Sequence, residues 1–158
     1  MSVAHFNIGS NIGHRATNID CAVSYLGRRV GRVIACSRPV ETAPWGFDSE
    51  NQFLNVGVNV ETRLTPLEII AEIQAIEQDL APEESHRDSN GNYVDRSVDI
   101  DLICYGNSVS NNPIAIVPHP RMHLRDFVLM PLVELMPEWE HPILHKTAAK
   151  LLAELSNK

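Results

Sequence analysis

Residues 53–60 read FLNVGVNV, and this stretch decides the fold because its residue types alternate strictly. Successive side chains of a strand point to opposite faces, so Leu54 and the three valines that follow at every second position form one apolar face. The other face carries Phe53, Asn55, a glycine and Asn59. The pattern predicts a half-buried strand. Its second face is either a floor suited to a flat polar ring or a solvated surface with one exposed aromatic side chain.

Residues 97–105, SVDIDLICY, show the same alternation more sharply. Three aliphatic side chains share one face, while Asp99 and Asp101 share the other, about 6.5–7 Å apart along the strand. Two carboxylates at this spacing repel each other, and a hard cation such as Mg²⁺ relieves the repulsion. The pair therefore indicates either a metal site or an exposed strand whose aspartates pair with arginine.

Around these two strands, hydrophobic spacing predicts further elements: strands over 3–8 and within 32–40, and helices over 16–26, 66–80 and 147–155. Gly27 is the expected cap of the first helix. Thr65 caps the second helix, with proline and glutamate at favoured positions behind it. Residues 81–95 read as a long polar loop.

The order strand, helix, strand, strand, helix, strand is that of the ferredoxin-like βαββαβ core. The sequence therefore predicts an α+β fold with an antiparallel sheet and helices on one face. The other face is then covered by the C-terminal third or left open for a ligand, so the active site is expected on that side.

Composition excludes several classes of protein. The 158 residues, 44% hydrophobic and 21% charged, predict a single globular domain over 1–158. No apolar run is long enough for a membrane span, and the start lacks the features of a signal peptide. A net charge of −7 argues against a nucleic-acid partner. The three scattered cysteines favour reduced thiols packed in the core of a cytoplasmic protein, and a monomer is expected.

Other motifs are weaker. Histidine pairs at 119/123 and 141/145 have helical spacing, but a proline directly follows the first histidine of each pair, which disfavours one helix and a zinc site. The segment 118–120 reads instead as a rigid stretch that aims His119. Arg121 and Arg125 beside it are suited to phosphate or are ordinary surface charge. The chain contains no Rossmann or P-loop motif, so an ATP site would be of another kind.

The stretch RSVDIDL at 96–102 resembles the RxxDxDL signature of the 6-hydroxymethyl-7,8-dihydropterin pyrophosphokinases. Further segments resemble the same family in the same order: IGSN at 8–11, ETAPWG at 41–46, FLN at 53–55, VPHPR at 117–121 and RDFVL at 125–129. The resemblance covers essentially the whole chain. It implies transfer of the β,γ-pyrophosphoryl group of ATP to the hydroxymethyl oxygen of the pterin, with release of AMP, in folate biosynthesis.

The resemblance also implies roles for individual residues. Asp99 and Asp101 bind two Mg²⁺ ions and form the catalytic set with Arg96. The pterin contacts are implied for Phe53, Phe127, Asn55, Thr42, Ala43 and Trp45, with the two phenylalanines on either side of the ring. The ATP contacts are implied for Gln74, Arg87, Arg96, His119 and Arg125. Residues 80–95 form a longer segment than in many members and offer Arg87 where those members place several arginines.

Two other classes of function compete with this interpretation. A non-catalytic ferredoxin-like module would bind a nucleotide or small ring, and its affinity would be indifferent to Mg²⁺. A metal-dependent phosphohydrolase with the same carboxylates would release phosphate from ATP without any pterin.

Overall fold

The computed structural model describes residues 1–43, 52–82 and 97–157. Their strands form one antiparallel sheet in the order β2-β4-β1-β5, with β3 also paired to β4. The strands are β1 (Ser2–Ser10), β2 (Gly31–Cys36), β3 (Val40–Thr42), β4 (Phe53–Thr62) and β5 (Asp99–Tyr105). The helices are α1 (Arg15–Arg29), α2 (Pro66–Leu80), α3 (Asp126–Leu135) and α4 (Ala148–Ser156), with a short 3₁₀ turn at Met122–Leu124.

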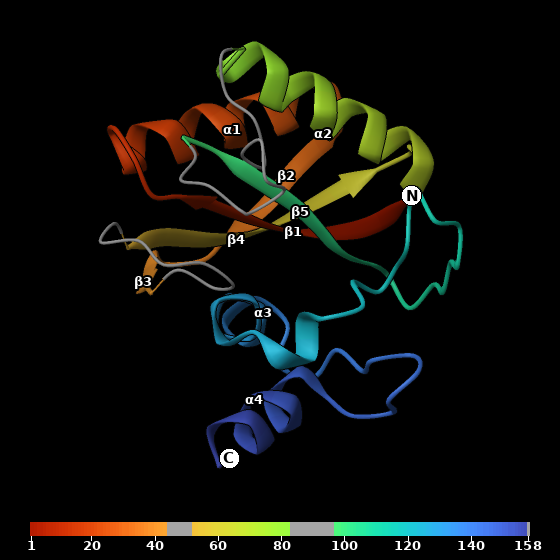
Figure 1. Cartoon of the computed structure of the whole chain (residues 1–158). Coiled ribbons are helices and arrows are strands. Elements are labelled where there is room, and N and C mark those ends of the chain that lie inside the picture. The colour runs from red at the N-terminus through yellow and green to blue at the C-terminus, as the bar shows by residue number, and fades with distance from the viewer. Residues whose placement is uncertain (44–51, 83–96, 158) are drawn as a thin grey trace.

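The helices lie on both sides of the sheet (Figure 1). Helices α1 and α2 lie against one face, and α3 and α4 lie on the opposite side. The strand order and the two crossover helices α1 and α2 confirm the ferredoxin-like α+β core. The sequence left two alternatives for the second face of the sheet, a cover formed by the C-terminal third or a face open to a ligand. The structure places α3 and α4 of the C-terminal third on that side.

The first face of the sheet holds the larger core. Phe6 and Ile8 of β1, Val58 of β4, and Ile69 and Ile73 of α2 are all buried in it. Helix α2 begins at the predicted cap, where Thr65 Oγ1 accepts from the Glu68 N–H and Glu68 Oε1 accepts from the Thr65 N–H, at 3.2 and 3.0 Å. Both hydrogen bonds of this capping box are therefore formed, as the sequence predicted.

Helix α3 packs against the second face of the sheet, where it contacts β1, β3 and β4. Helix α3 packs directly on β4 at Gly57, where a Cβ atom would lie 2.7 Å from Pro131 Cβ and 2.9 Å from His5 Cε1. Next to it, His5 Nδ1 donates to Asn59 Oδ1 at 2.7 Å. Gly57 and Asn59 therefore belong to the core under α3, and of the four polar-face positions of this strand only Phe53 and Asn55 lie beyond that contact.

Several local expectations are wrong. Helix α1 does not stop before Gly27 but continues to Arg29, where Arg28 and Arg29 both stack on the Tyr25 ring and Arg29 bonds to Asp79 of α2. These side-chain contacts outweigh the low helix propensity of glycine. Helix α3 was not predicted, because Pro131 lies inside it.

The strand expected within 32–40 is two strands. The register moves from Cys36 opposite Val58 to Val40 opposite Asn55, so three residues oppose two between these pairs. Ser37 occupies the break, and its Oγ accepts from the Gly57 N–H at 2.8 Å. The side chain thus takes the place of a main-chain acceptor where the two strands separate.

The cysteines also differ from expectation. Cys104 is buried, but Cys21 on α1 and Cys36 on the edge strand β2 are exposed. Among the described residues, strand β2 pairs only with β4, and its residues alternate between half-buried and exposed positions, which turns Cys36 outward. The prediction that all three thiols pack in the core is therefore wrong for two of them.

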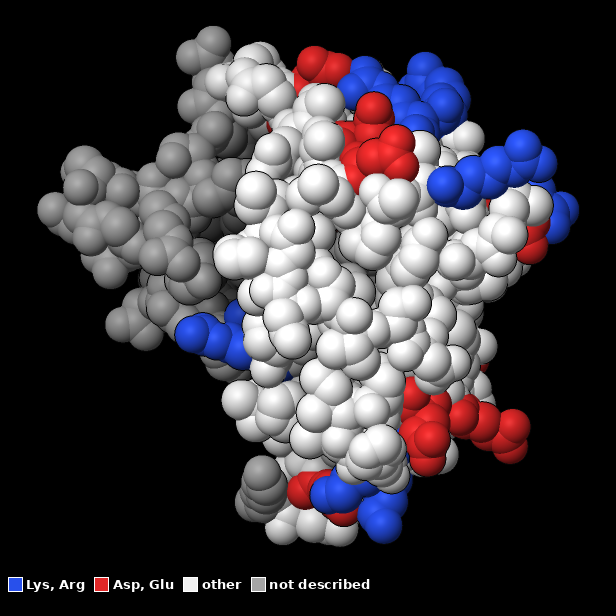
Figure 2. Space-filling view, turned by 90° about the vertical axis from the view of Figure 1, so that its right-hand side faces the viewer, with Lys and Arg blue, Asp and Glu red and all other residues white. Residues whose placement is uncertain are grey.

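Charge is unevenly spread over the surface. Figure 2 shows charged side chains around the margins of one face, with a broad area in its middle that shows none. In the sequence, residues 105–120 contain no Asp, Glu, Lys or Arg, and Val109, Ile114 and Ile116 within this stretch are exposed. In the part of the chain that the structure describes, no helix is long and apolar enough to cross a membrane.

Candidate active site

The site is organised by a row of residues that crosses three strands. Gly9 of β1 lies opposite Asn55 of β4 on one side and opposite Asp99 of β5 on the other. Since neighbouring strands are about 4.8 Å apart, the backbones of Asn55 and Asp99 are separated by about 10 Å. The next row on this face is Gly57, Asn7 and Asp101. Strand pairing thus brings the expected ring-binding amide and both expected metal-binding carboxylates onto one face.

Gly9 shapes the first row because it has no side chain. A Cβ atom there would lie 3.1 Å from Asn55 Oδ1 and 3.2 Å from Phe53 Cδ1. The Asn55 amide and the Phe53 ring therefore both lie over the backbone of β1. Any larger residue at position 9 would displace one of them.

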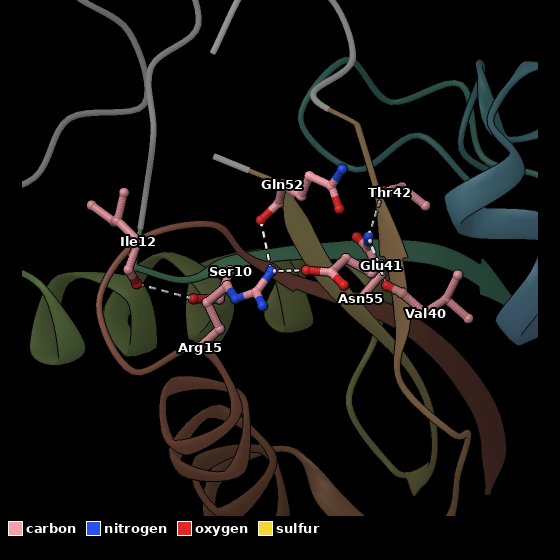
Figure 3. A network of polar contacts seen from close by, with 8 residues as sticks. All are labelled: Ser10, Ile12, Arg15, Val40, Glu41, Thr42, Gln52 and Asn55. Atoms are coloured by element: carbon pink, nitrogen blue, oxygen red, sulfur yellow. Dashed lines mark hydrogen bonds and ion pairs between the residues drawn. The ribbon is translucent and has the colours of Figure 1, made fainter. Parts of the chain in front are cut away.

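The Asn55 side chain is buried and its orientation is set by β3. Its Nδ2 donates to Thr42 Oγ1 at 2.8 Å and to the Val40 carbonyl at 3.4 Å (Figure 3). With both bonds on the Nδ2 side, Oδ1 lies toward Gly9. The amide therefore presents a hydrogen-bond acceptor to the middle of the row. A ring with N–H or NH₂ groups on its edge fits such an acceptor.

Helix α3 is attached to the sheet at the first turn, where Phe127 lies. Asn7 Nδ2 donates to the Phe127 carbonyl at 2.8 Å. The guanidinium carbon of Arg125 lies 5.6 Å from the centre of the Phe127 ring, and only 9% of Arg125 is exposed. The expected pterin residue Phe127 and the expected ATP residue Arg125 are thus held side by side at the end of α3 nearest the row.

His119 is held beside β5 by hydrogen bonds to main-chain groups. Register slips between His5 and Phe6 of β1, which leaves Ile103 of β5 without a partner opposite, and the Ile103 carbonyl accepts from the His119 N–H at 2.7 Å. His119 Nδ1 accepts from the Arg121 N–H at 3.1 Å. Burial lowers the pKa of His119 to about 4, with further lowering from Arg125 and Arg121. The ring is therefore neutral at pH 7 and carries its proton on Nε2, as a donor.

Helix α2 reaches the free edge of β5 through Glu77. Glu77 Oε2 accepts from the Ile100 N–H at 2.7 Å. Gln74 lies one turn earlier on the same side of the helix and is exposed. The expected ATP residues thus come from both layers: Gln74 from the α1 and α2 layer, His119 and Arg125 from the other. Strand β5 lies between them.

Three expected residues, Trp45, Arg87 and Arg96, lie outside the described residues. Ala43 is exposed at the end of β3. Asn7 and Gly9 also belong to the candidate site, and the sequence did not predict them. Their signal was the alternation of residues 5–9, HFNIG, in which Phe6 and Ile8 face the core.

The donor set bears on metal binding. Among the described residues, no group of three or more His, Cys, Asp or Glu side chains is arranged to hold an ion. Asp99 and Asp101 are half-buried carboxylates at alternate positions of one strand. Carboxylate oxygens suit Mg²⁺, which usually takes one or two protein carboxylates together with substrate phosphates and waters. The pair fits a metal that arrives with a polyphosphate better than a site built from protein ligands alone.

Fold and site together define a class: an α+β protein with a ferredoxin-like core and a candidate small-molecule site on the second face of its sheet. The family model described as 7,8-dihydro-6-hydroxymethylpterin-pyrophosphokinase (HPPK) matches residues 5–137. The chain belongs to this family.

Individual relatives agree. The 2-amino-4-hydroxy-6-hydroxymethyldihydropteridine pyrophosphokinase of Porphyromonas gingivalis (strain ATCC 33277) is 39% identical over 143 residues, which are 90% of this chain and 95% of that protein. The enzyme of the same name from Aquifex aeolicus is 31% identical over 146 residues, covering 92% of this chain and 88% of the other. The crystal structure of wild-type Plasmodium falciparum HPPK-DHPS has the same fold, with a TM-score of 0.77 at 15% identity. It matches 97% of this chain, which spans only 44% of that longer chain.

Proposed function

We propose that this chain performs the reaction that gives its family its name. It transfers the β,γ-pyrophosphoryl group of ATP to the hydroxymethyl oxygen of 6-hydroxymethyl-7,8-dihydropterin, in folate biosynthesis, and does so as a single domain over 1–158. The observation that supports this best is the row in which Gly9 separates Asn55 from Asp99. A ring bound at the amide would have its substituent within reach of a phosphate bound at the carboxylate.

The pterin lies over Gly9 in this proposal. Phe53 and Phe127 hold the two faces of the ring, and aromatic stacking favours such a planar ligand. Asn55 Oδ1 accepts from the amino-pyrimidine edge, because Thr42 already occupies the Nδ2 side. Main-chain groups of Thr42, Ala43 and Trp45 complete the edge contacts.

Asp99 and Asp101 hold two Mg²⁺ ions, which neutralise charge on the triphosphate when they are bound. ATP lies along β5, contacted by Gln74 from one layer and by His119 and Arg125 from the other. Arg87 and Arg96 are further contacts proposed from sequence alone. The neutral His119 donates from Nε2 to a phosphate oxygen. Arg96 and Arg125 stabilise the negative charge that develops on the bridging and transferred oxygens.

The transfer forms one bond and breaks one. The hydroxymethyl oxygen bonds to the β-phosphorus, and the bond from that phosphorus to the oxygen of the α-phosphate breaks, which yields AMP and the pterin diphosphate. The hydroxyl proton goes to Asp101, directly or through water. Most of the catalysis in such a transfer comes from positioning and charge stabilisation rather than covalent chemistry by the protein.

Formation of AMP from ATP, Mg²⁺ and 6-hydroxymethyl-7,8-dihydropterin tests the proposal. Pterin-dependent AMP that disappears when Mg²⁺ is chelated and in Asp99→Ala is the expected result. Glu61→Ala is the matched control. It removes a carboxylate from the end of β4 opposite to Phe53, and it should keep full activity. Phosphate or ADP without pterin would point to a hydrolase. Ligand binding that is indifferent to Mg²⁺, with no AMP, would point to a binding module.

The remaining parts of the proposal concern the setting of the enzyme. A cytoplasmic location is supported by the three cysteines, which are all free thiols. We also propose a monomer that acts on small molecules and has no nucleic-acid or membrane partner. Sedimentation velocity at micromolar concentration tests the monomer, and a species of twice the 17.6 kDa chain mass would refute it.

A further inference from the structure

Arg15, the first residue of α1, reaches across to the strands that hold Thr42 and Phe53 (Figure 3). Its Nη1 donates to Glu41 Oε1 at 2.8 Å and to the Gln52 carbonyl at 3.0 Å. Glu41 lies in β3, and Gln52 immediately precedes β4. One guanidinium nitrogen therefore ties the middle residue of β3 to the residue that precedes β4.

Strand β3 is short, and besides its pairing with β4 it contacts α3. It contains three residues, which pair as Val40 with Asn55, Glu41 with Leu54, and Thr42 with Phe53. The bond from Asn55 Nδ2 to Thr42 Oγ1 exists only while this register holds. If β3 shifted or frayed, the amide would lose the partner that turns Oδ1 toward Gly9.

We propose that Arg15 is a positioning residue for the pterin half of the site. By holding Glu41 and the Gln52 carbonyl together, it fixes β3 against β4 and so sets the direction of the Asn55 amide and the place of the Phe53 ring. The inference rests on the proposed pterin site. It predicts a selective effect, since the proposed ATP contacts lie around β5 at the other edge of the sheet.

Steady-state AMP formation tests the selectivity. Arg15→Ala is expected to raise the KM for the pterin about three- to tenfold at saturating ATP and Mg²⁺, the range for losing one partly exposed ion pair and one hydrogen bond. The KM for ATP should stay within about twofold of wild type. Arg32→Ala is the matched control. It breaks another arginine–glutamate pair, Arg32 to Glu61 at 3.3 Å, on the same sheet but far along β4 from Phe53, and should leave both values unchanged.

A double-mutant cycle tests the route through Glu41. If Arg15 acts by holding β3, Glu41→Ala raises the pterin KM in the same way, and the double variant is less impaired than the product of the two single effects. Arg15→Lys keeps one cationic donor and should fall between wild type and Arg15→Ala. Should Arg15→Ala fail to fold, Arg15→Lys and Glu41→Ala carry the same test.

The outcomes separate this inference from the proposed function. An unchanged pterin KM in both Arg15→Ala and Glu41→Ala would overturn the positioning role. A parallel rise in the KM of ATP would overturn it as well, because that points to a direct phosphate contact or general damage. If wild type formed no AMP, the transfer would be refuted. The positioning role is then decided by calorimetric Kd values for the pterin, measured with Mg²⁺ and an ATP analogue bridged by methylene between the α and β phosphorus atoms. A Kd that Arg15→Ala does not raise, or no pterin binding by wild type, overturns it.

Discussion

Stability toward acid should depend strongly on His5, which lies fully buried under α3. Its Nδ1 donates to Asn59, and Nε2 is enclosed without a hydrogen-bond partner among the described residues. Protonating Nε2 would place a charge and an unsatisfied donor in the core. Burial accordingly lowers the pKa of His5 to about 4, only partly opposed by the bond to Asn59.

The direction in which pH changes the free energy of unfolding follows from proton binding by the two states. In the unfolded chain the histidine has its ordinary pKa of 6.5, so between pH 6.5 and 4 the unfolded state binds the extra proton and the folded state does not. The free energy of unfolding therefore rises with pH through this window. The stabilisation is fully present above pH 6.5 and is lost as the pH falls toward 4. A difference of 2.5 pKa values, 6.5 minus 4, corresponds to about 3 kcal/mol, of which about 2 kcal/mol is lost between pH 7 and 4.5.

Urea unfolding of wild type and of the double variant His5→Phe/Asn59→Leu, at several values between pH 4.5 and 7, measures this term. Replacing both partners with apolar groups of similar shape avoids leaving an unpaired amide. The double variant should lose less stability on acidification, by about 2 kcal/mol over the range. His119 and His141, whose pKa values are also lowered mainly by burial, contribute equally to both proteins and cancel.

His14→Gln, a change at an exposed histidine before α1, is the matched control and should follow the wild-type profile. If the double variant and wild type lost stability in parallel, the neutral buried state of His5 would be refuted. The sign is equally decisive: a double variant that was more sensitive to acid would show that His5 is protonated in the folded protein.

Gly57→Ala should lower the free energy of unfolding by about 1–3 kcal/mol, because its Cβ would meet Pro131 at 2.7 Å, and should also raise the pterin KM; unchanged urea midpoints would contradict the tight packing of α3. Thr65→Ala should cost about 1 kcal/mol by removing the cap of α2, measured by thermal unfolding, whereas Thr65→Ser should cost less. Asp101→Asn should lower kcat for AMP formation at least about 100-fold at saturating Mg²⁺, and near-normal turnover would eliminate Asp101 as proton acceptor.

The fold was predictable where one face of each element is buried. The alternation in 53–60 and 97–105 survives in β4 and β5, because each buried aliphatic side chain forces the next residue to the other face. Prediction failed where a tertiary contact outweighs a local rule. Arg29 extends α1 past Gly27 through its bond to Asp79, and Ser37 replaces a main-chain acceptor where the edge strand divides.

The candidate site was predictable as a set of residues but not as an arrangement. Motifs identify Asn55 and Asp99 separately, yet only strand register places them on either side of Gly9. Register depends on long-range pairing, which a single sequence does not specify. The direction of the Asn55 amide depends on Thr42, from a strand whose division from β2 the sequence did not indicate. The contacts of Arg15 with Glu41 and Gln52 likewise depend on the placement of β3 and β4, which lie far from Arg15 in the sequence.

The second face of the sheet has two roles. Part of it is buried under α3, and part of it is proposed to bind the pterin. The boundary is the row of Gly57, Asn7 and Asp101. Gly57 admits Pro131 on one side of this row, while Asn7 in its middle binds the Phe127 carbonyl. The helix that closes the core thus carries, in its first turn, the residue proposed to cover the pterin. Any change that lifts α3 should therefore weaken both folding and pterin binding, whereas a change at Arg15 should weaken binding with little effect on folding.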